Sequence, residues 1–184
     1  MLRAGLLERT VVATAGGAEH VAAACAALGA RTVALEAELL DEQAVTAAAV
    51  ALGAVGTLVC DAAPAFATAG GGVEGLTVAL EGAWNAARAV ANAVWRRGEG
   101  GKLVLLGPRP RDGAHAAALG AALENTARTL SIEWARYAIR STAVLPADAT
   151  TDDEVAMLIA YLASPAGDYF SGCAFSLSAG TAAR

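Results

Sequence analysis

Four residues that can carry charge or move a proton follow short apolar runs of this sequence: Asp61, Arg109, Asp112 and His115. A carboxylate, a guanidinium and an imidazole that meet in one cleft can bind a polar ligand and exchange protons with it. In open α/β sheets, ligands bind outside the carboxyl ends of the strands, where such residues would lie. The alternative for each residue alone is a solvated loop position, so the four define a candidate cleft.

His20 and the three cysteines are the remaining candidates for chemistry. His20 stands at the start of a small-residue segment, where it either binds a phosphate group or is simply a histidine at a helix start. Cys25, Cys60 and Cys173 lie far apart in apolar surroundings. That spacing predicts buried, reduced thiols and no metal site, because a metal needs clustered ligands.

The elements that position these residues alternate between short apolar strands and helices. Such alternation predicts right-handed βαβ units and a parallel sheet that is covered on both faces, without an internal repeat or linker. The predicted strands span residues 9–14, 31–35, 56–60, 102–106, 140–145 and 173–177. The predicted helices span residues 21–28, 41–52, 76–95, 113–137 and 152–163, and the tract 61–75 is predicted as a loop.

The predicted helix 113–137 carries one continuous apolar stripe with helical spacing. Its members are Leu119, Leu123, Ala127, Leu130, Trp134 and Tyr137. Asp112 is its predicted N-cap. Gly120 costs such a helix about 1 kcal/mol relative to Ala. We therefore expect either a close neighbour at Gly120 or the loss of a larger residue.

Composition limits the classes of protein. The chain has 184 residues, of which 56% are hydrophobic and 17% charged, with a net charge of −5. This length predicts a single domain, 1–184, with a sizeable core. The negative charge disfavours nucleic acid and anionic membranes as partners. With neither a long apolar run nor a signal-like start, the sequence predicts a soluble, cytoplasmic protein.

Segments throughout the chain resemble the short-chain dehydrogenase/reductase (SDR) family, and in particular its 3-oxoacyl/3-hydroxyacyl thioester reductase branch. The central segment is LENTARTLSIEWARYAIRSTAVLPA, residues 123–147. Further matches occur in the order of the family: VVATAGGAEHVAAACAALGA, GTLVCDAA, ALEGAWNAARAV, GGKLVLLGP and LASPAGDYFSGCAFSLSAG. The resemblance implies a Rossmann-like, doubly wound, three-layer αβα fold.

The residues that carry the family's chemistry are missing from the matching positions. The resemblance calls for a Tyr acid, a Lys four residues later, a Ser after the preceding strand and an Asn on the fourth helix. Those positions hold Ala116, Gly120, Gly107 or Pro108, and Ala79. None of these side chains transfers a proton. His115 lies next to the lost Tyr position and could replace it as an acid, but it faces a different side of the helix from Ala116. The alternative is an ordinary histidine at a helix start.

The cofactor segment departs from the family as well. Gly16 stands at the first glycine of the phosphate loop, but His20 and Ala22 replace the second and third. The stretch 31–42 resembles the second and third strands run together, so one βα unit is predicted to be missing. Glu36 or Glu38 would be a weak remnant of the ribose-binding acid. The substrate-covering lid is reduced to ADATTDDEV, residues 147–155.

These departures predict a non-catalytic SDR-fold subunit, a pseudoenzyme with no catalytic, cofactor-binding or metal residues. Helices 76–95 and 113–137 resemble the pair through which the family dimerises, and 155–177 resembles its second interface. The expected partner is a second copy or an active NAD(P)-dependent SDR that acts on acyl thioesters. Some of five apolar residues are expected to complete an apolar surface shared with a second subunit: Leu80, Trp84, Leu123, Leu130 and Trp134. The alternative is that all five face the core of this chain. The alternatives are a ligand-binding protein or enzyme with a repurposed cleft, and a weak NAD(P)-dependent oxidoreductase.

Overall fold

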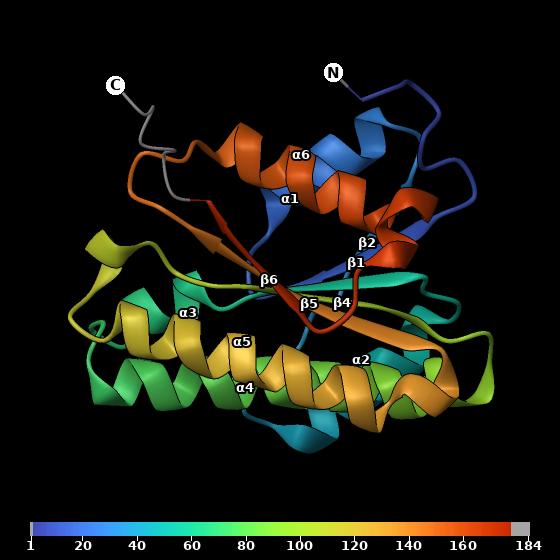
Figure 1. The fold of residues 1–184 in the computed structure, drawn as a ribbon. Coiled ribbons are helices and arrows are strands. Elements are labelled where there is room, and N and C mark those ends of the chain that lie inside the picture. Colours follow the sequence, from blue (N-terminus) through green and yellow to red (C-terminus); the bar gives the residue numbers. More distant parts are fainter. Residues whose placement is uncertain (1, 178–184) are drawn as a thin grey trace, which may run out of the picture.

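The computed structural model describes residues 2–177 and contains a six-stranded parallel sheet between two layers of helices (Figure 1). This is the predicted Rossmann-like αβα fold. The sheet order is β2-β1-β3-β4-β5-β6. The strands are β1 (Val11–Ala15), β2 (Arg31–Ala34), β3 (Thr57–Asp61), β4 (Gly101–Leu106), β5 (Ile139–Pro146) and β6 (Cys173–Leu177).

Helices α1 and α6 cover one face of the sheet, and α2, α3, α4 and α5 cover the other (Figure 1). The helices are α1 (Glu19–Ala27), α2 (Glu42–Leu52), α3 (Ala63–Thr68), α4 (Val73–Ala93), α5 (Ala116–Glu133) and α6 (Asp152–Ala163). Four 3-10 turns complete the elements: η1 (Trp95–Arg97), η2 (Pro110–Asp112), η3 (Ala135–Tyr137) and η4 (Pro165–Tyr169).

The chain changes direction across the sheet after β2. Strand β1 pairs with β2 on one side and with β3 on the other, so the order reverses between β1 and β3. The doubly wound order of dinucleotide-binding folds has a third strand beyond β2. Here β2 is the edge strand, and residues 31–42 form one strand and a loop. The sheet is therefore one strand shorter on that side, as predicted.

Alternation along the central strands divides the core into two layers. In β3 every residue is buried; Leu58 and Cys60 face the α4 side, whereas Val59 faces the α1 and α6 side. A strand that is buried on both faces needs apolar residues throughout, which explains its continuous apolar run. The stripe residues Leu119, Leu123, Ala127 and Leu130 of α5 are buried against the same α4-side layer.

Side-chain hydrogen bonds fix several element boundaries. The Asp41 carboxylate accepts hydrogen bonds from the backbone N–H groups of Gln43 and Ala44, which confirms it as the N-cap of α2. Thr151 and Glu154 form a capping box at the start of α6. The Lys102 ammonium donates to the carbonyls of the last turn of α6 and beyond: Leu162, Ala163 and Ser164.

Two predicted boundaries were wrong. Asp112 does not cap α5: it ends the turn η2, where its carboxylate accepts from the Arg109 N–H. Helix α5 starts at Ala116, with His115 at the N-cap. The helix ends at Glu133 and continues only as the 3-10 turn η3.

The tract 61–75 is not all loop, because α3 forms around the fully buried Phe66. The burial of the Phe66 side chain stabilises this helix, although the residues around it carry no helical pattern of apolar residues.

Candidate functional site

The loops that follow β1, β3, β4 and β5 meet at one edge of the sheet, because the strands are parallel. Gly16, after β1, has a φ of +81°, and a Cβ there would overlap the Asp61 carbonyl oxygen at the end of β3. Only glycine allows the two strand ends to approach this closely. The ends of β1 and β3 therefore lie in close contact, at the edge of the sheet where the candidate residues were expected.

The first turn of α1, which follows Gly16 and Gly17, carries a negative charge. The N-cap, Ala18, provides no side-chain hydrogen bond, so the first N–H groups of α1 are uncapped by the protein. The Glu19 carboxylate lies at this turn, with Oε2 3.8 Å from the position that a Cβ on Gly17 would take. His20 follows in the first turn and is half-buried. A carboxylate here opposes the binding of a phosphate group at the helix N-terminus.

Asp61 is the buried ionisable group of the cleft. Its residue is 7% exposed, and its Oδ1 accepts a hydrogen bond of 3.0 Å from the Ala63 N–H. Desolvation raises the pKa of Asp61 to about 7. The Ala63 hydrogen bond and the Arg109 charge lower the pKa, while the Glu19 and Asp112 charges raise it. Asp61 therefore exchanges between acid and carboxylate near neutral pH, as a general acid or base must.

Arg109 and Arg111 attach the short loop 147–151, which replaces the expected lid, to the loop after β4. The Arg109 guanidinium donates to the Thr150 carbonyl and forms an ion pair with Asp152. The Arg111 backbone N–H and guanidinium both bind Asp148. Through these contacts the two arginines hold the loop 147–151 against the ends of the strands. Arg109 therefore lies near Asp61 and also binds Thr150 and Asp152.

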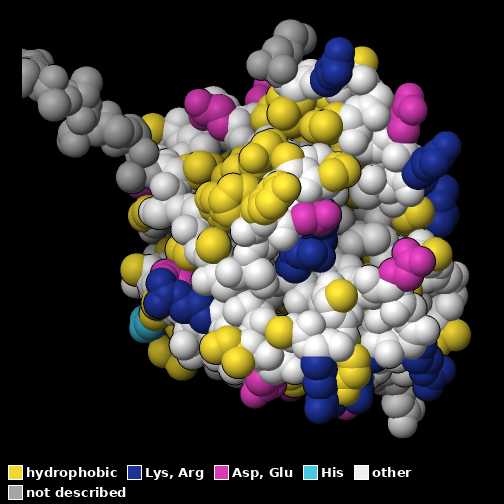
Figure 2. Space-filling model, turned by 45° about the vertical axis from the view of Figure 1, so that its right-hand side comes forward, with side chains coloured by type: hydrophobic (Ala, Val, Ile, Leu, Met, Phe, Trp, Pro, Cys, Tyr) yellow, Lys and Arg dark blue, Asp and Glu magenta, His cyan; other side chains and the backbone are white. Residues whose placement is uncertain are grey.

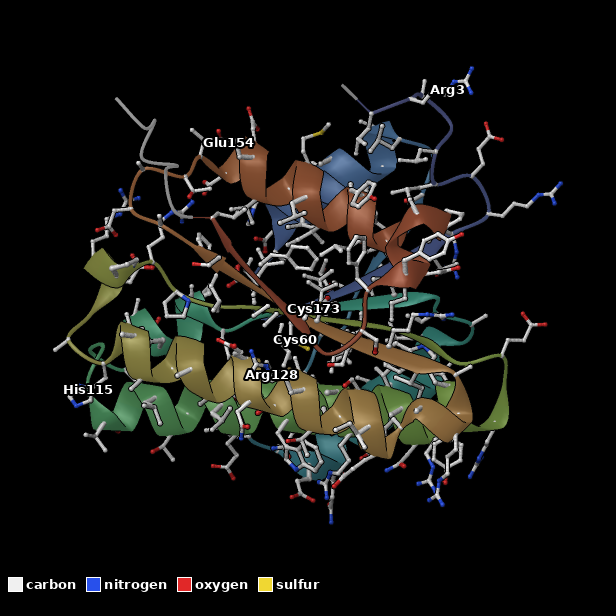
Figure 3. The ribbon with its side chains drawn as sticks, in the orientation of Figure 1. Arg3, Cys60, His115, Arg128, Glu154 and Cys173 are labelled. Carbon is white, nitrogen blue, oxygen red and sulfur yellow. The ribbon has the colours of Figure 1, made fainter. Side chains whose placement is uncertain are left out.

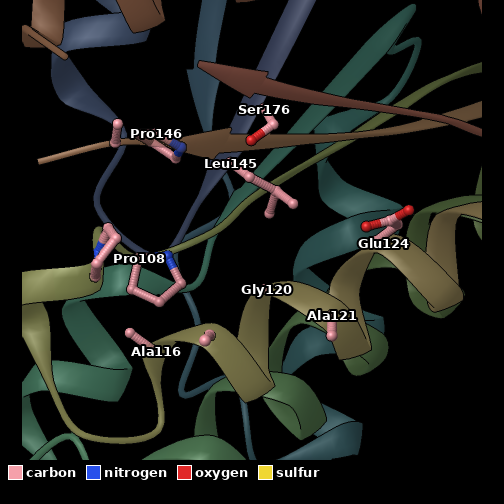
Figure 4. Close-up of a pocket in the computed structure, with 11 residues that line it drawn as sticks. Pro108, Ala116, Gly120, Ala121, Glu124, Leu145, Pro146 and Ser176 are labelled. Atoms are coloured by element: carbon pink, nitrogen blue, oxygen red, sulfur yellow. The ribbon is translucent and has the colours of Figure 1, made fainter. Parts of the chain in front are cut away.

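A pocket of about 370 Å³ opens between the strand ends and α5 (Figure 4). Its described lining consists of small apolar residues with one carboxylate and one hydroxyl: Pro108, Pro110, Ala116, Ala117, Gly120, Ala121, Glu124, Leu145, Pro146, Ala147 and Ser176. The Leu145 side chain extends from β5 towards α5 (Figure 4). A Cβ at Gly120 would meet only the Leu145 Cδ2, at 3.6 Å. The small residues of α5 thus leave space in this chain.

The structure separates some of the predicted site residues. Asp61, Arg109 and Asp112 interact electrostatically, as their mutual effects on the Asp61 pKa indicate. His115 lies apart from the sheet at the start of α5 (Figure 3). Its backbone N–H donates to the Gly71 carbonyl between α3 and α4, and its Nδ1 is buried with no hydrogen-bond partner among residues 2–177. The side chains of His115 and Asp61 form no hydrogen bond with each other, as a catalytic pair would require.

The remaining candidates also have defined places. Ala79, at the expected Asn position, is buried on α4 and lines a second, smaller cavity. Glu36 and Glu38 are exposed after β2, and Glu38 accepts from the Leu40 N–H at 3.5 Å. Within residues 2–177, no three His, Cys, Asp or Glu residues cluster to hold a metal.

The predicted burial of the cysteines was correct for two of the three. Cys25 and Cys60 are buried free thiols, and Cys173 is a partly exposed free thiol. Desolvation raises the pKa of Cys25 to about 11; desolvation, followed by the neighbouring Asp61, raises that of Cys60 to about 12. Neither buried thiol is a nucleophile at neutral pH.

Sequence reasoning missed Glu124 and Leu145 as lining residues of the pocket beside α5 and Asp152 as the partner of Arg109. Glu124 carries a signal that was available, since it stands one turn after Gly120 on the same helix. No sequence signal identified Asp152, because its contact with Arg109 joins segments that lie 43 residues apart.

Solved structures of dehydrogenases share this fold. The citronellol catabolism dehydrogenase AtuB of Pseudomonas aeruginosa PAO1 superimposes with a TM-score of 0.79 and 22% identity, covering 96% of this chain and 96% of that chain. A short chain dehydrogenase from Mycobacterium smegmatis gives 0.79 and 22%, covering 99% and 97%. A hydroxysteroid dehydrogenase from Escherichia coli gives 0.76 and 19%, covering 96% and 98%.

At these identities the likeness establishes the fold of the short-chain dehydrogenases. No protein-family model matches the sequence, and no curated protein matches it. In the part of the chain that the structure describes, none of the helices is both long and apolar enough to cross a bilayer.

Proposed function

We propose that this chain is a non-catalytic subunit, residues 1–184 forming one shortened SDR-like domain, which acts by assembly. Its partner is a second copy or an active NAD(P)-dependent dehydrogenase of the same fold that acts on acyl thioesters. One observation carries the proposal: the pocket at the expected position of the Tyr–Lys pair is lined by Ala116 and Gly120. Neither side chain has a proton to transfer or a charge to lower the pKa of a neighbour.

The charges around Asp61 disfavour the binding of a dinucleotide. Glu19, Asp61 and Asp112 place carboxyl groups around the turn where a pyrophosphate would lie, and they oppose its charge. Arg109 is the cation of this group, and it already pairs with Asp152. Binding a dinucleotide here would require breaking that pair or accepting unbalanced negative charge.

The outer surface of α4 and α5 supports assembly. Trp84 and Trp134 stack with ring centroids 6.2 Å apart, and Trp84 is 39% exposed. Large aromatic side chains that remain partly exposed are typical of interface centres. Leu123 and Leu130 do not contribute to this surface, because both are buried within this chain's own core. The proposed surface therefore consists of Trp84, Trp134 and the half-buried Leu80.

The α6 and β6 end provides a second apolar surface for the proposed assembly. Tyr161, Phe170 and Phe175 form a contiguous aromatic cluster, with neighbouring ring centroids 6.1 Å and 5.4 Å apart. Tyr169 next to it is 89% exposed. Figure 2 shows apolar side chains gathered on the upper half of this end of the molecule, at the level of the α1 and α6 layer. Exposed apolar patches of this kind mark interaction sites.

The test is the oligomeric state of three proteins: wild type, Trp84→Glu and the matched control Val50→Glu on α2, where Val50 is 66% exposed. Light scattering coupled to gel filtration should show an oligomer for the wild type and for Val50→Glu, and a monomer for Trp84→Glu. Co-expression with SDR paralogues of the same organism, followed by co-purification, tests the heteromeric form. A strictly monomeric wild type that co-purifies with none of them would contradict the proposal.

A repurposed cleft is the second candidate function, and Asp61 favours it. A buried carboxyl with a pKa of about 7 at a strand end is typical of binding and catalytic sites. The names of the similar structures favour an oxidoreductase, which would retain cofactor affinity. Calorimetry with NADH and NADPH separates these functions: stoichiometric, tight binding supports an oxidoreductase or a dinucleotide-binding cleft, and its absence supports the non-catalytic subunit.

A further inference from the structure

Strand β2 forms an open edge of the sheet, and its residues are more exposed than those of the central strands. All residues of β3 are buried, whereas Arg31 and Ala34 of β2 are exposed and Thr32 and Val33 are half-buried. Among the described strands, β2 pairs only with β1. The side of β2 that faces away from β1 therefore has no neighbouring strand within residues 2–177.

The direction of the ladder hydrogen bonds identifies the backbone groups that this edge presents. The N–H groups of Arg31 and Leu35 donate to carbonyls of β1 and of the residue before it. Successive residues of a strand point their N–H and C=O groups to opposite sides, so the backbone groups of Thr32 and Ala34 point outward. In the described part of the chain, no hydrogen bond from another segment reaches them.

Strand β2 lacks the features that protect other sheet edges from pairing. Protected edges carry a bulge, a proline or a charged side chain in the middle of the strand. Thr32, Val33 and Ala34 are uncharged, and β2 pairs with β1 in a continuous register. Helix α1, which packs against β2, exposes only small side chains after its first turn: Ala23, Ala26 and Ala27. Another backbone can therefore approach the outer side of β2.

The charges at the two ends of β2 have opposite signs. Arg31 begins the strand, Glu36 and Glu38 follow its end, and all three are exposed. Among residues 2–177, no ion pair involves any of them. When two copies of β2 pair antiparallel across a two-fold axis, Arg31 of each copy lies beside the end of the other copy's strand, where the carboxylates lie. The edge is therefore complementary to itself, which favours a second copy as its occupant.

We propose that β2 pairs with β2 of a second copy, antiparallel and with the two-fold axis at Val33. In this register Thr32 of one copy lies opposite Ala34 of the other, and each such pair exchanges both backbone hydrogen bonds. A register shifted to either side places one of these residues opposite residue 30 or 36, outside the strand. The two Val33 residues form a non-hydrogen-bonded pair with Cα atoms about 4.5 Å apart.

This pairing is weak by itself, because 4 residues of each chain bury far less than the about 800 Å² per partner of a standard interface. It populates a dimer only at high protein concentration, so dilute Trp84→Glu protein stays monomeric. In the proposed assembly, β2 adds a contact at a surface separate from Trp84 and Trp134. The inference does not depend on that surface, because either contact forms without the other.

The experiment traps the pair as a disulfide between two Val33→Cys chains. A Cα separation of about 4.5 Å lies within the range of about 4.4–6.8 Å that a disulfide spans. All proteins carry Trp84→Glu, which removes the other proposed contact, and Cys173→Ser, which removes the partly exposed native thiol. The matched control is Asp153→Cys, an exposed residue on α6.

Three further variants, each added to Val33→Cys, test the pairing itself. Thr32→Pro and Ala34→Pro each remove an outward N–H group but no ladder hydrogen bond to β1. Arg31→Glu leaves the backbone unchanged and reverses the charge at the start of the strand, so the test stands even where a proline variant does not fold. Circular dichroism verifies the folding of each variant.

The measured quantity is the rate of dimer formation on non-reducing gels during oxidation with glutathione disulfide. Val33→Cys should cross-link about tenfold faster than Asp153→Cys, because pairing raises the local thiol concentration, and salt should slow it. Either proline should lower the rate to that of Asp153→Cys, and Arg31→Glu should also slow it. Equal rates of Val33→Cys and Asp153→Cys, or a rate that all three added variants leave unchanged, would overturn the proposal. Because every protein carries Trp84→Glu, this result is independent of the proposed function.

Discussion

Replacing Asp61 by Asn should remove a pH-dependent loss of stability that one buried carboxyl causes. Desolvation raises the pKa of Asp61 from 3.8 to about 7 in the folded chain. The folded state therefore keeps a proton that the unfolded state releases between those pH values. By linkage, this contribution to stability is fully present below about pH 4 and is lost as the pH rises to about 7.

The magnitude follows from the size of the shift. About three pKa units at about 1.4 kcal/mol each give an upper limit of about 4 kcal/mol for the whole interval. Between pH 5.5 and 7.5 the same two pKa values give a fall of about 2 kcal/mol in the free energy of unfolding. Asp61 is 7% exposed, so solvent screening reduces this figure little.

The assay is urea unfolding of the wild type, Asp61→Asn and Asp153→Asn at pH 5.5, 6.5, 7.5 and 8.5. Asn is uncharged at every pH and still accepts from the Ala63 N–H. We therefore expect Asp61→Asn to gain about 2 kcal/mol relative to wild type between pH 5.5 and 7.5, while Asp153→Asn follows the wild type. Parallel stability curves for wild type and Asp61→Asn would refute the reasoning, because they would mean that Asp61 titrates equally in both states.

Two further predictions concern charged side chains that hold loops and helix ends. Lys102→Met should lower the free energy of unfolding by about 2–3 kcal/mol, measured in urea, because it leaves the carbonyls at the end of α6 unpaired and removes the ion pair with Asp168. The control is Arg128→Met, which removes the ion pair of Arg128 with Glu124 on the surface of α5; a smaller effect of Lys102→Met than of this control would contradict the prediction. Arg109→Met should speed amide exchange in residues 147–151 and raise the pKa of Asp61, because the guanidinium holds Thr150 and lowers that pKa; unchanged exchange would show that Asp148 and Arg111 alone secure the loop.

The sequence by itself determined the class of fold and most element positions. Strands β2, β4 and β6 and helices α2 and α6 lie within a residue or two of their predicted ranges. The reason is local: their apolar periodicity and caps, such as Asp41, act over only a few residues. Local patterns also explain the errors at Asp112 and in the tract 61–75, because Phe66 is buried by residues that are distant in the sequence.

The tertiary structure alone decided how the candidate residues meet. It brought Arg109 to Asp152 and Asp61 to Arg109, separated His115 from them, and buried Leu123 and Leu130 inside the chain. It also opened one pocket beside Gly120 and another beside Ala79. Desolvation and charge pairing depend on distances between segments that are far apart in the sequence. No local pattern contains those distances, and so the pKa of Asp61 and the shape of its surroundings emerge only when the sheet is assembled.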